Sequence, residues 1–319
     1  MKIVITARNF DTTNLEPIKK LKEAGHEVIE AANHDMGTAT AEDSVIALAK
    51  DADAVIAGLE PYSKRVIENC PNLKMISRRG IGYDSVDVEE CKKRGITLAK
   101  TSGMVEGAVA EHVMAFILYF AKEIHTQSES MHRGEWNRVM VQGAKSRVLG
   151  LVGFGGIGKE IAKRAVPFGM KVVYNCRHPK KEWEDEFGVE YRDLDTLLAE
   201  SDYVSVNVPL TDSTKKMFND ELFAKMKEGS VFINIARGGV MDEYALKRAL
   251  DSGHLKGAGI DVFEKEPCTD SPLISCPNAA LTPHTAPYTS ENFVEMNRVT
   301  AQNVLDFIEG KLPEKNRVV

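Results

Sequence analysis

The stretch LGLVGFGGIG, residues 149–158, constrains the fold most, because an apolar run leads directly into glycines at G-x-G-x-x-G spacing. Gly153 permits a tight turn from strand to helix, and Gly155 lets the backbone approach a pyrophosphate with no Cβ in the way. Gly158 lets the following helix pack closely on the sheet, and its N-terminal N–H groups are free to bind an anion. A plain loop is the alternative, but apolar residues continue at helical spacing after the glycines. The sequence therefore predicts a dinucleotide site formed by Gly153, Gly155, Gly156, Ile157 and Gly158.

Short apolar runs alternate with helix-like stretches in two separate blocks, which is typical of parallel α/β sheets. Strands are predicted in the first block at 2–7, 26–31, 54–58, 73–77 and 95–99. Strands are predicted in the second block at 148–153, 171–175, 202–208, 230–236, 257–263 and 279–283. Helices are predicted at 16–24, at 105–133 between the blocks, and after Pro287 to about Gly310. We therefore expect an α/β chain with two doubly wound parallel sheets.

Composition excludes several classes of partner. The 319 residues are 43% hydrophobic, which is enough for two cores. The net charge of −6 argues against a nucleic-acid surface, so a small-molecule partner is expected. The longest apolar run, 113–121, is about half of a membrane span, and the N-terminus has no extended apolar region, so we expect a cytoplasmic protein. The five cysteines form no C-x-x-C pair and are expected to be reduced thiols, with no metal site.

Three polar residues follow predicted strands of the second block, where ligands of open α/β sheets bind. They are Arg237 in NIARGG, Glu266 in DVFEKEP and His284 in LTPHTAP. Because these strands belong to one sheet, we expect their side chains to share a site. Each also has an ordinary structural explanation: a hydrogen-bonded histidine, a solvated turn glutamate, or an arginine paired with Asp242 or Glu243.

The sequence resembles the D-isomer-specific 2-hydroxyacid dehydrogenase family over essentially its whole length. The matching motifs are GFGGIG, VPLT at 208–211, NIARG at 234–238, DVFEKEP at 261–267 and TPH at 282–284. The resemblance implies a homodimer in which a Rossmann cofactor domain is inserted into a flavodoxin-like substrate domain. The implied boundaries are 1–101 and 286–319 for the substrate domain and 102–285 for the cofactor domain. It also implies NAD(P)-dependent interconversion of a D-2-hydroxy acid and its 2-keto acid, with Arg237, Glu266 and His284 as the catalytic set.

The chemistry of such a reaction suits these residue types. Reduction of a 2-keto acid needs a hydride and a proton, and histidine titrates close enough to neutral pH to supply the proton. Glu266 would orient the His284 imidazole and favour its charged form. Arg237 offers a rigid fork of donors for a carboxylate and for charge that develops on the carbonyl oxygen.

The segment SRRGIGYD, residues 77–84, is the candidate substrate loop. Backbone N–H groups of Gly80, Ile81 and Gly82 would hold a substrate carboxylate, although the glycines could serve turn geometry only. The segment resembles the phosphoglycerate dehydrogenase branch, whose matching arginine, here Arg78, would suit a substrate phosphate. Arg78 could equally be structural, which leaves 3-phosphoglycerate and glyoxylate or hydroxypyruvate as alternatives. No C-terminal regulatory domain is expected after Val319.

The cofactor residues implied by the resemblance include Asp261, which would bind the nicotinamide amide. The others lie on the adenine and ribose side or beside the catalytic arginine: Val208, Pro209, Thr214, Ile235 and Ala236. Arg237 and His284 would contact both cofactor and substrate.

The informative departure is Cys176, which stands where the family places an acidic residue for the ribose 2′-hydroxyl. With no carboxylate to repel a 2′-phosphate, and with Arg177 next in a basic run, the sequence favours NADP(H) over NAD(H). The alternative is that Asn175 binds an NAD ribose and the basic run is a solvated face.

Other functions stay open at this point. A non-enzymatic, dinucleotide-sensing corepressor or scaffold of the same fold could keep the same three residues. Formate dehydrogenases resemble this architecture but carry Gln where this chain has Glu266, which disfavours formate. A phosphite-oxidising relative is harder to exclude.

Overall fold

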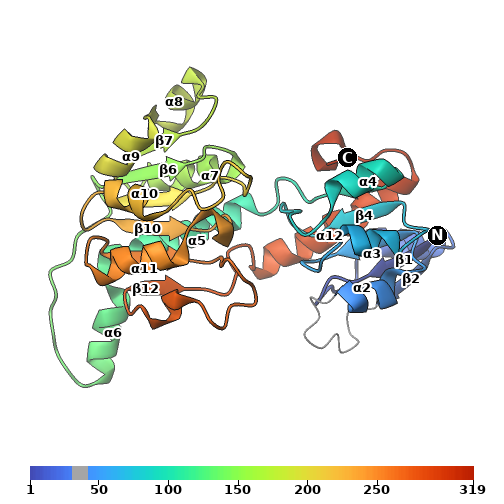
Figure 1. Cartoon of the computed structure of the whole chain (residues 1–319), viewed down its shortest axis with the longest axis horizontal. Helices are drawn as coiled ribbons and strands as arrows, with labels where there is room; N and C mark the ends of the chain where they lie inside the picture. The colour runs from blue at the N-terminus through green and yellow to red at the C-terminus, as the bar shows by residue number, and fades with distance from the viewer. Residues whose placement is uncertain (31–41) are drawn as a thin grey trace. The chain divides into compact units, whose positions relative to one another are not determined.

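The computed structural model describes residues 1–30 and 42–319. The chain divides into two compact units, Met1–Val105 with Thr289–Val319, and Glu106–Tyr288. Figure 1 shows helices on both faces of the sheet in each unit. The predicted α/β class with two parallel sheets is confirmed.

The first unit has a five-stranded parallel sheet in the order β2-β1-β3-β4-β5. Its strands are β1 Lys2–Ile5, β2 Glu27–Glu30, β3 Ala54–Ala57, β4 Met75–Arg78 and β5 Thr97–Ala99. Its helices are α1 Glu16–Glu23, α2 Glu42–Ala49, α3 Lys64–Glu68, α4 Val88–Arg94 and α12 Ser290–Ile308. Residue 31, the last of one predicted strand, lies outside the described residues.

Alternation along β1 builds a core on each face of this sheet. Val4 packs in one cluster with Val55, whereas Ile3 and Ile5 pack in another with Val304 of α12. Successive side chains of a strand point to opposite faces, so an all-apolar run such as this one is buried on both.

The second unit has a seven-stranded parallel sheet in the order β12-β11-β10-β9-β6-β7-β8. Its strands are β6 Val148–Val152, β7 Lys171–Asn175, β8 Val189–Tyr191, β9 Tyr203–Val206, β10 Val231–Asn234, β11 Gly257–Ile260 and β12 Ala279–Leu281. Its helices are α5 Glu106–Lys122, α6 Ile124–His132, α7 Gly156–Ala165, α8 Lys181–Phe187, α9 Leu194–Glu200, α10 Asp220–Lys225 and α11 Glu243–Asp251. The reversal of strand order at β6 and β9 is the switch point at which such sheets bind ligands.

The single helix predicted at 105–133 is wrong, because the structure has two helices there. Glu123 separates α5 from α6 and adopts a left-handed conformation, with φ 48°. Its carboxylate accepts a hydrogen bond from Lys256 Nζ at 2.8 Å, which ties the break to the start of β11. The left-handed Glu123 thus separates the two helices and a tertiary contact accompanies the break, whereas the apolar pattern alone would continue the helix.

Two glycines of β11 let α5 lie directly against the sheet. A Cβ at Gly257 would come within 2.4 Å of the Phe120 ring, and a Cβ at Gly259 within 2.6 Å of the Phe116 ring. The phenylalanines are four residues apart on one face of the helix, and the glycines are two apart on one face of the strand. The pattern GAGI thus fixes the register between helix and strand.

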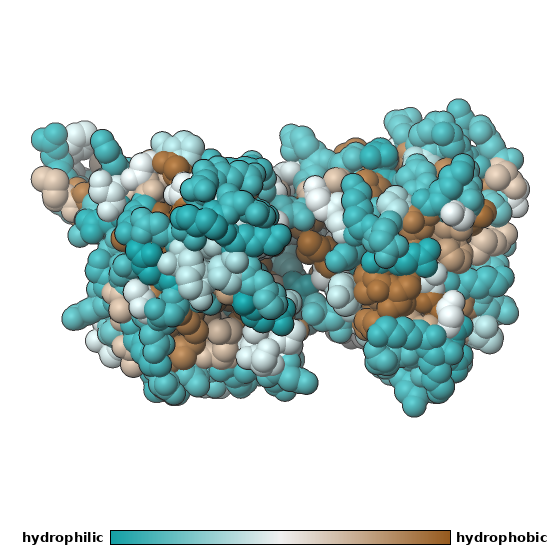
Figure 2. Space-filling model, turned by 90° about the horizontal axis from the view of Figure 1, so that it is seen from above, coloured by the Kyte–Doolittle hydropathy of each residue, from teal (hydrophilic) through white to brown (hydrophobic). Residues whose placement is uncertain are grey.

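Large apolar side chains are exposed at separate places on the surface, among them Trp136, Met140 and Val294. Figure 2 shows a face on which hydrophilic residues predominate and hydrophobic residues form separate, smaller patches. None of the helices in the described part of the chain combines the length and apolar character that a membrane span requires.

Candidate active site

The glycine loop connects β6 to α7 as predicted. Gly153 has φ +100°, and a Cβ there would lie 2.8 Å from the Asn207 carbonyl carbon. A Cβ at Gly158 would lie 2.7 Å from the carbonyl oxygen of Gly153, so this residue sets the close approach of helix to strand. Gly155 has no atom within 4 Å of its Cβ position, and it begins α7 with no side-chain cap. The open side of the loop therefore exposes helix N-terminal N–H groups to an anion.

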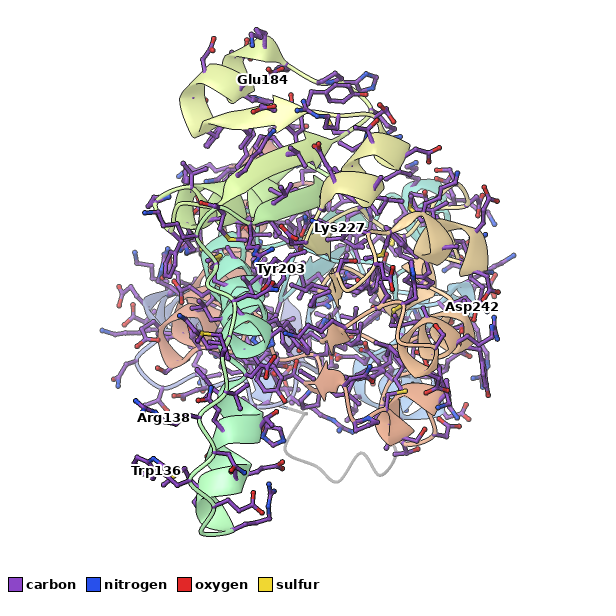
Figure 3. The ribbon with its side chains drawn as sticks, turned by 90° about the vertical axis from the view of Figure 1, so that its left-hand side faces the viewer. Trp136, Arg138, Glu184, Tyr203, Lys227 and Asp242 are labelled. Atoms are coloured by element: carbon purple, nitrogen blue, oxygen red, sulfur yellow. The ribbon has the colours of Figure 1, made fainter. Side chains whose placement is uncertain are left out.

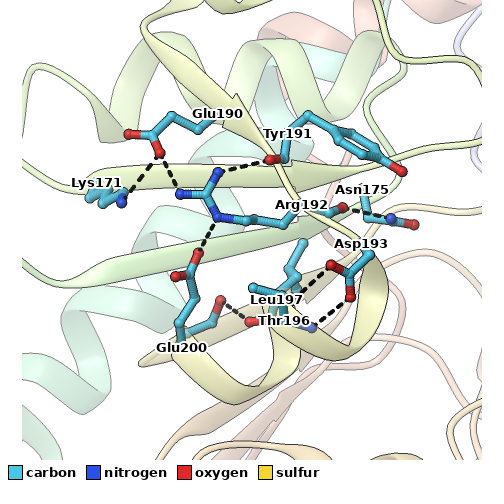
Figure 4. Close-up of polar contacts among 10 residues, drawn as sticks. Lys171, Asn175, Glu190, Tyr191, Arg192, Asp193, Thr196, Leu197 and Glu200 are labelled. Carbon is cyan, nitrogen blue, oxygen red and sulfur yellow. Dashed lines mark hydrogen bonds and ion pairs between the residues drawn. The ribbon is translucent and has the colours of Figure 1, made fainter.

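Asn175 ends β7 within a polar network on the sheet edge (Figure 4). Its Nδ2 donates to the carbonyl oxygen of Arg192 at 2.8 Å. The Arg192 guanidinium in turn binds Glu190 at 2.5 Å and Glu200 at 3.1 Å. The Asn175 amide N–H is thus directed to the edge strand, which leaves its oxygen as the group that can face a ligand.

The basic run after Cys176 is unevenly paired. Lys180 lies 3.6 Å from Glu182, and Lys181 lies 2.9 Å from Glu184. Arg177 is exposed and makes no hydrogen bond or ion pair with any residue in 1–30 or 42–319. Cys176 itself is half-buried. Arg177, which follows it, is therefore a cation of this run without an acidic partner among the described residues.

Thr214 closes the loop that follows β9. Its hydroxyl donates to the carbonyl oxygen of Pro209 at 2.7 Å and accepts from the Thr211 N–H at 2.8 Å. Val208 is half-buried at the start of the same loop. Ile235 is buried and Ala236 half-buried after β10.

Arg237 is held by the turn at the end of β10. The Asn234 side chain accepts from the Ala236 N–H and donates to the Arg237 carbonyl, each at 3.0 Å. A Cβ at Gly238 would lie 1.9 Å from the carbonyl carbon of Phe263, so only glycine lets this turn pack against the backbone after β11. The turn therefore brings Arg237 to the loop that carries Glu266.

Glu266 and His284 form a direct pair. Glu266 Oε2 lies 2.7 Å from His284 Nδ1, and the two side chains are 31% and 24% exposed. Glu266 Oε1 accepts from the Phe263 N–H at 3.0 Å, which fixes the carboxylate. Burial opposes ionisation of Glu266, but the hydrogen bond and charge of His284, the Phe263 N–H and the charge of Arg237 outweigh it and lower the pKa. The geometry leaves His284 Nε2 as the ring nitrogen that can face a substrate.

Asp261 organises the turn on which His284 stands. It is completely buried, and its carboxylate accepts from the Thr282 hydroxyl at 2.5 Å and from the N–H groups of Thr285 at 2.8 Å and Ala286 at 2.9 Å. The His284 N–H donates to the Asp261 carbonyl at 2.8 Å. His284 has φ 54°, a backbone conformation that is uncommon for residues other than glycine, and these hydrogen bonds hold the backbone in that conformation.

Two further residues order this site; the sequence suggests Glu243 only as a possible partner of Arg237 and does not indicate His112. Glu243 is buried and accepts from the Glu264 N–H at 2.7 Å and the Ser271 hydroxyl at 2.5 Å, which shapes the loop around Glu266. His112 Nε2 lies 3.0 Å from the Thr282 hydroxyl oxygen. No local sequence pattern indicates these contacts, because each contact joins residues that are far apart in the chain.

The predicted substrate loop lies in the first unit, after β4. Arg78 is 5% exposed, and its guanidinium donates to the Arg79 carbonyl and covers Gly80. The Gly80 N–H donates to the Thr101 hydroxyl at 2.9 Å. The N–H groups of Ile81 and Gly82 have no acceptor among the described residues.

The structure thus places Arg237, Asp261, Glu266 and His284 after the carboxyl ends of the neighbouring strands β10, β11 and β12. The glycine-rich loop follows β6 of the same sheet. Arg78 and residues 80–82 belong to the other unit.

This chain is similar in sequence to known proteins. A family model described as D-isomer specific 2-hydroxyacid dehydrogenase, NAD binding domain, matches residues 114–286. The chain is 39% identical over 274 residues to a glyoxylate reductase of Thermococcus litoralis, covering 83% of each protein. It is 41% identical over 257 residues to a hydroxypyruvate reductase of Thermotoga maritima, covering 78% of this chain and 83% of that one.

Solved structures give the same result over the full length. A D-lactate dehydrogenase from Aquifex aeolicus, complexed with NAD and lactic acid, matches with a TM-score of 0.86 and 28% identity, covering 100% of this chain and 99% of that one. An acyclic imino acid reductase in complex with NADPH and D-Arg matches with a TM-score of 0.88 and 26% identity, covering 100% of both chains.

Proposed function

Since the chain belongs to the D-isomer-specific 2-hydroxyacid dehydrogenase family and is an NAD(P)-dependent oxidoreductase, we propose that it reduces a small, unphosphorylated 2-keto acid such as glyoxylate or hydroxypyruvate. The observation that carries the proposal is the 2.7 Å pair of His284 and Glu266, at the strand ends of the sheet that also bears the glycine loop. The dinucleotide is assigned to the unit Glu106–Tyr288, and the substrate-binding loop to the other unit.

Each catalytic side chain has a defined task in this reaction. The reduced nicotinamide supplies the hydride to the keto carbon when it is bound. His284 donates a proton from Nε2 to the carbonyl oxygen, while Glu266 holds Nδ1 and stabilises the protonated ring before transfer. Arg237 binds the substrate carboxylate and the carbonyl oxygen as charge develops there. The products are the 2-hydroxy acid, D-configured where its C2 is a stereocentre, and the oxidised dinucleotide, and His284 regains its proton from water.

Two observations favour an unphosphorylated substrate. Relatives that are 39% and 41% identical to this chain are named glyoxylate reductase and hydroxypyruvate reductase. The Arg78 guanidinium, the candidate phosphate ligand, is buried against its own loop. The N–H groups of Ile81 and Gly82 are the donors we assign to the substrate carboxylate.

NADPH is the proposed reductant. Cys176 replaces the carboxylate that would repel a 2′-phosphate, and Arg177 beside it is exposed with no partner among the described residues. An unpaired guanidinium at this strand end is available to bind a phosphate through charge-assisted hydrogen bonds.

A homodimer completes the proposal. Figure 3 shows α6 and the segment after it standing away from the body of their unit, with Trp136 and Arg138 directed outward. Trp136 is 79% exposed and Met140 97% exposed, which is unusual for large apolar side chains in a monomer. We assign this arm to the dimer contact, and Trp136→Glu should shift the sedimentation coefficient toward that of a monomer.

The test of function is a panel of 2-keto acids assayed with NADH and NADPH, including glyoxylate, hydroxypyruvate, pyruvate and 3-phosphohydroxypyruvate. We expect the highest kcat/KM with glyoxylate or hydroxypyruvate, the D-configured product from hydroxypyruvate and pyruvate, and loss of turnover in His284→Ala. A chain that oxidises neither dinucleotide with any keto acid would instead support the scaffold alternative. A preference for 3-phosphohydroxypyruvate would overturn the assignment of an unphosphorylated substrate.

A further inference from the structure

We propose that His112 is a positioning residue for His284, acting through the Thr282 hydroxyl and the Asp261 carboxylate. The inference rests on the proposed role of His284 as the acid–base residue. Neither the motifs around His284 nor the pattern of α5 points to His112, which the sequence leaves as an ordinary core or surface histidine.

The register of α5 on β11 places His112 at the active-site end of the sheet. Phe116 packs against Gly259 of β11, and His112 precedes Phe116 by one helical turn. Four helical residues rise about 6 Å and two strand residues about 6.6 Å, so the two elements stay in step. One step beyond Gly259 is Asp261, and His112 Nε2 lies 3.8 Å from its Oδ1. The His112 ring stands edge-on to Phe116 with centroids 4.8 Å apart, which holds its orientation.

The Thr282 hydroxyl determines which residue donates and which accepts in the hydrogen bonds among His112, Thr282 and Asp261. A hydroxyl has one proton, and that of Thr282 goes to Asp261 Oδ1 at 2.5 Å. Thr282 must therefore accept from His112, whose Nε2 lies 3.0 Å from the hydroxyl oxygen and so carries a hydrogen. Burial lowers the pKa of His112, and the charge of Asp261 only partly offsets this. The neutral ring thus has a single proton, and the proton is on Nε2.

The hydrogen bond from His112 to Thr282 affects the position of His284 through the backbone of residues 282–286. The same Asp261 carboxylate that receives the Thr282 proton also binds the N–H groups of Thr285 and Ala286, on the far side of His284. His112 fixes the Thr282 hydroxyl in the orientation that points at Asp261, so both sides of the positive-φ residue His284 are anchored on one carboxylate. An unanchored Thr282 would let this turn relax and move the His284 ring away from its reacting position.

The kinetic test compares substitutions that remove or retain the Nε2 donor. His112→Phe keeps a ring on Phe116 but has no donor, and we expect kcat to fall about tenfold with little change in the dinucleotide Kd. His112→Gln can place an amide N–H near the Nε2 position and should recover most of that loss. Thr282→Val removes the intermediate hydroxyl, and the double variant with His112→Phe should lose no more than the worse single one.

A matched control is available at the other end of β11. His254 precedes β11, and its Nε2 lies 3.0 Å from the Phe223 carbonyl oxygen, so it is also a hydrogen-bonded histidine of this unit. His254→Phe should leave kcat unchanged. A fall in kcat equal to that of His112→Phe would indicate a general structural effect and overturn the proposal.

A readout independent of activity uses ¹⁵N-histidine NMR. Wild-type His112 should show the Nε2–H tautomer, and His112→Phe and Thr282→Val should each shift the imidazole signals of His284. Absence of turnover by the wild type refutes the proposed function but leaves these shifts as the test of the contact. A wild-type enzyme that depends on His284, but whose kcat and His284 signals are unaffected in His112→Phe and Thr282→Val, refutes the inference alone.

Discussion

Two regions at the strand ends of the same sheet, one after β11 and β12 and the other after β7, have opposite arrangements. After β11 and β12, Asp261, Glu266 and His284 form hydrogen bonds of 2.5–3.0 Å with one another, with the Thr282 hydroxyl and with backbone N–H groups. After β7, Arg177 is exposed and has no partner among the described residues. The region after β11 and β12 is therefore held by internal hydrogen bonds, whereas the region after β7 has an arginine that is available to bind a ligand.

The difference corresponds to two kinds of task. Proton transfer needs groups held in a fixed geometry, and burial with complete hydrogen bonding provides it. Binding of a cofactor phosphate needs a positive charge on a side chain long enough to contact it, and an exposed arginine provides both without being held by neighbouring hydrogen bonds. Substitutions at the catalytic end should therefore change rates strongly, and substitutions at the β7 end should change cofactor preference modestly.

The largest effect is expected for His284→Ala, which removes the proton donor from the organised end. We expect kcat to fall by about 10²- to 10⁴-fold, with the dinucleotide Kd almost unchanged because the glycine loop is untouched. Stopped-flow assays and a fluorescence titration with NADPH measure the two quantities. Near-normal turnover would show that another group supplies the proton.

A smaller loss is expected for Glu266→Gln, which keeps the shape but removes the charge beside His284. We expect kcat to fall by about 10- to 100-fold. Glu264→Gln is the matched control, because its exposed carboxylate lies 3.3 Å from Lys216 instead of in the site. An equal loss in both variants would contradict a specific role for Glu266.

The same variant tests how stability depends on pH. The pKa of Glu266 in the folded chain lies below its ordinary value of 4.5. Its ionised form therefore stabilises the folded state above that value, and this contribution is lost as the pH falls through the lowered pKa. The difference in unfolding free energy between wild type and Glu266→Gln should shrink from neutral pH to acid pH in urea titrations. A constant difference would mean that the Glu266 charge adds nothing to folding.

The sequence predicts most of the fold because buried parallel strands read as apolar runs. It misses β8, since only Val189 of this edge strand is buried. It also misses the break at Glu123, because the contact with Lys256 that accompanies it spans more than a hundred residues. Local pattern therefore predicts elements whose burial is regular, and it does not indicate a break that is accompanied by a contact with a distant residue.

The candidate site divides in the same way. The glycine loop and the Arg237, Glu266 and His284 set are indicated by motifs at strand ends. The residues behind them are not, because the role of His112 depends on the packing of α5 on β11. Gly257 and Gly259 are the sequence signal that could have revealed it, since alternate glycines in a buried strand indicate a close approach by another element.

The smallest effect is expected at the open end, where Arg177→Ala removes the free cation. We expect NADPH binding to weaken by about 1.5 kcal/mol, roughly tenfold, at the lower end of the range for a hydrogen bond to a charged group because Arg177 is exposed. NADH, which has no 2′-phosphate, should bind almost as before. Lys181→Ala is the matched control, because its ammonium is already paired with Glu184 at 2.9 Å and should not discriminate between the cofactors.

Cys176→Asp should act in the same direction as Arg177→Ala on the ratio of kcat/KM for NADPH to kcat/KM for NADH, because a carboxylate accepts from a ribose hydroxyl but repels a phosphate. If the wild type already prefers NADH by tenfold or more, then Arg177 is only a surface cation and the oxygen of Asn175 becomes the group to test against the ribose.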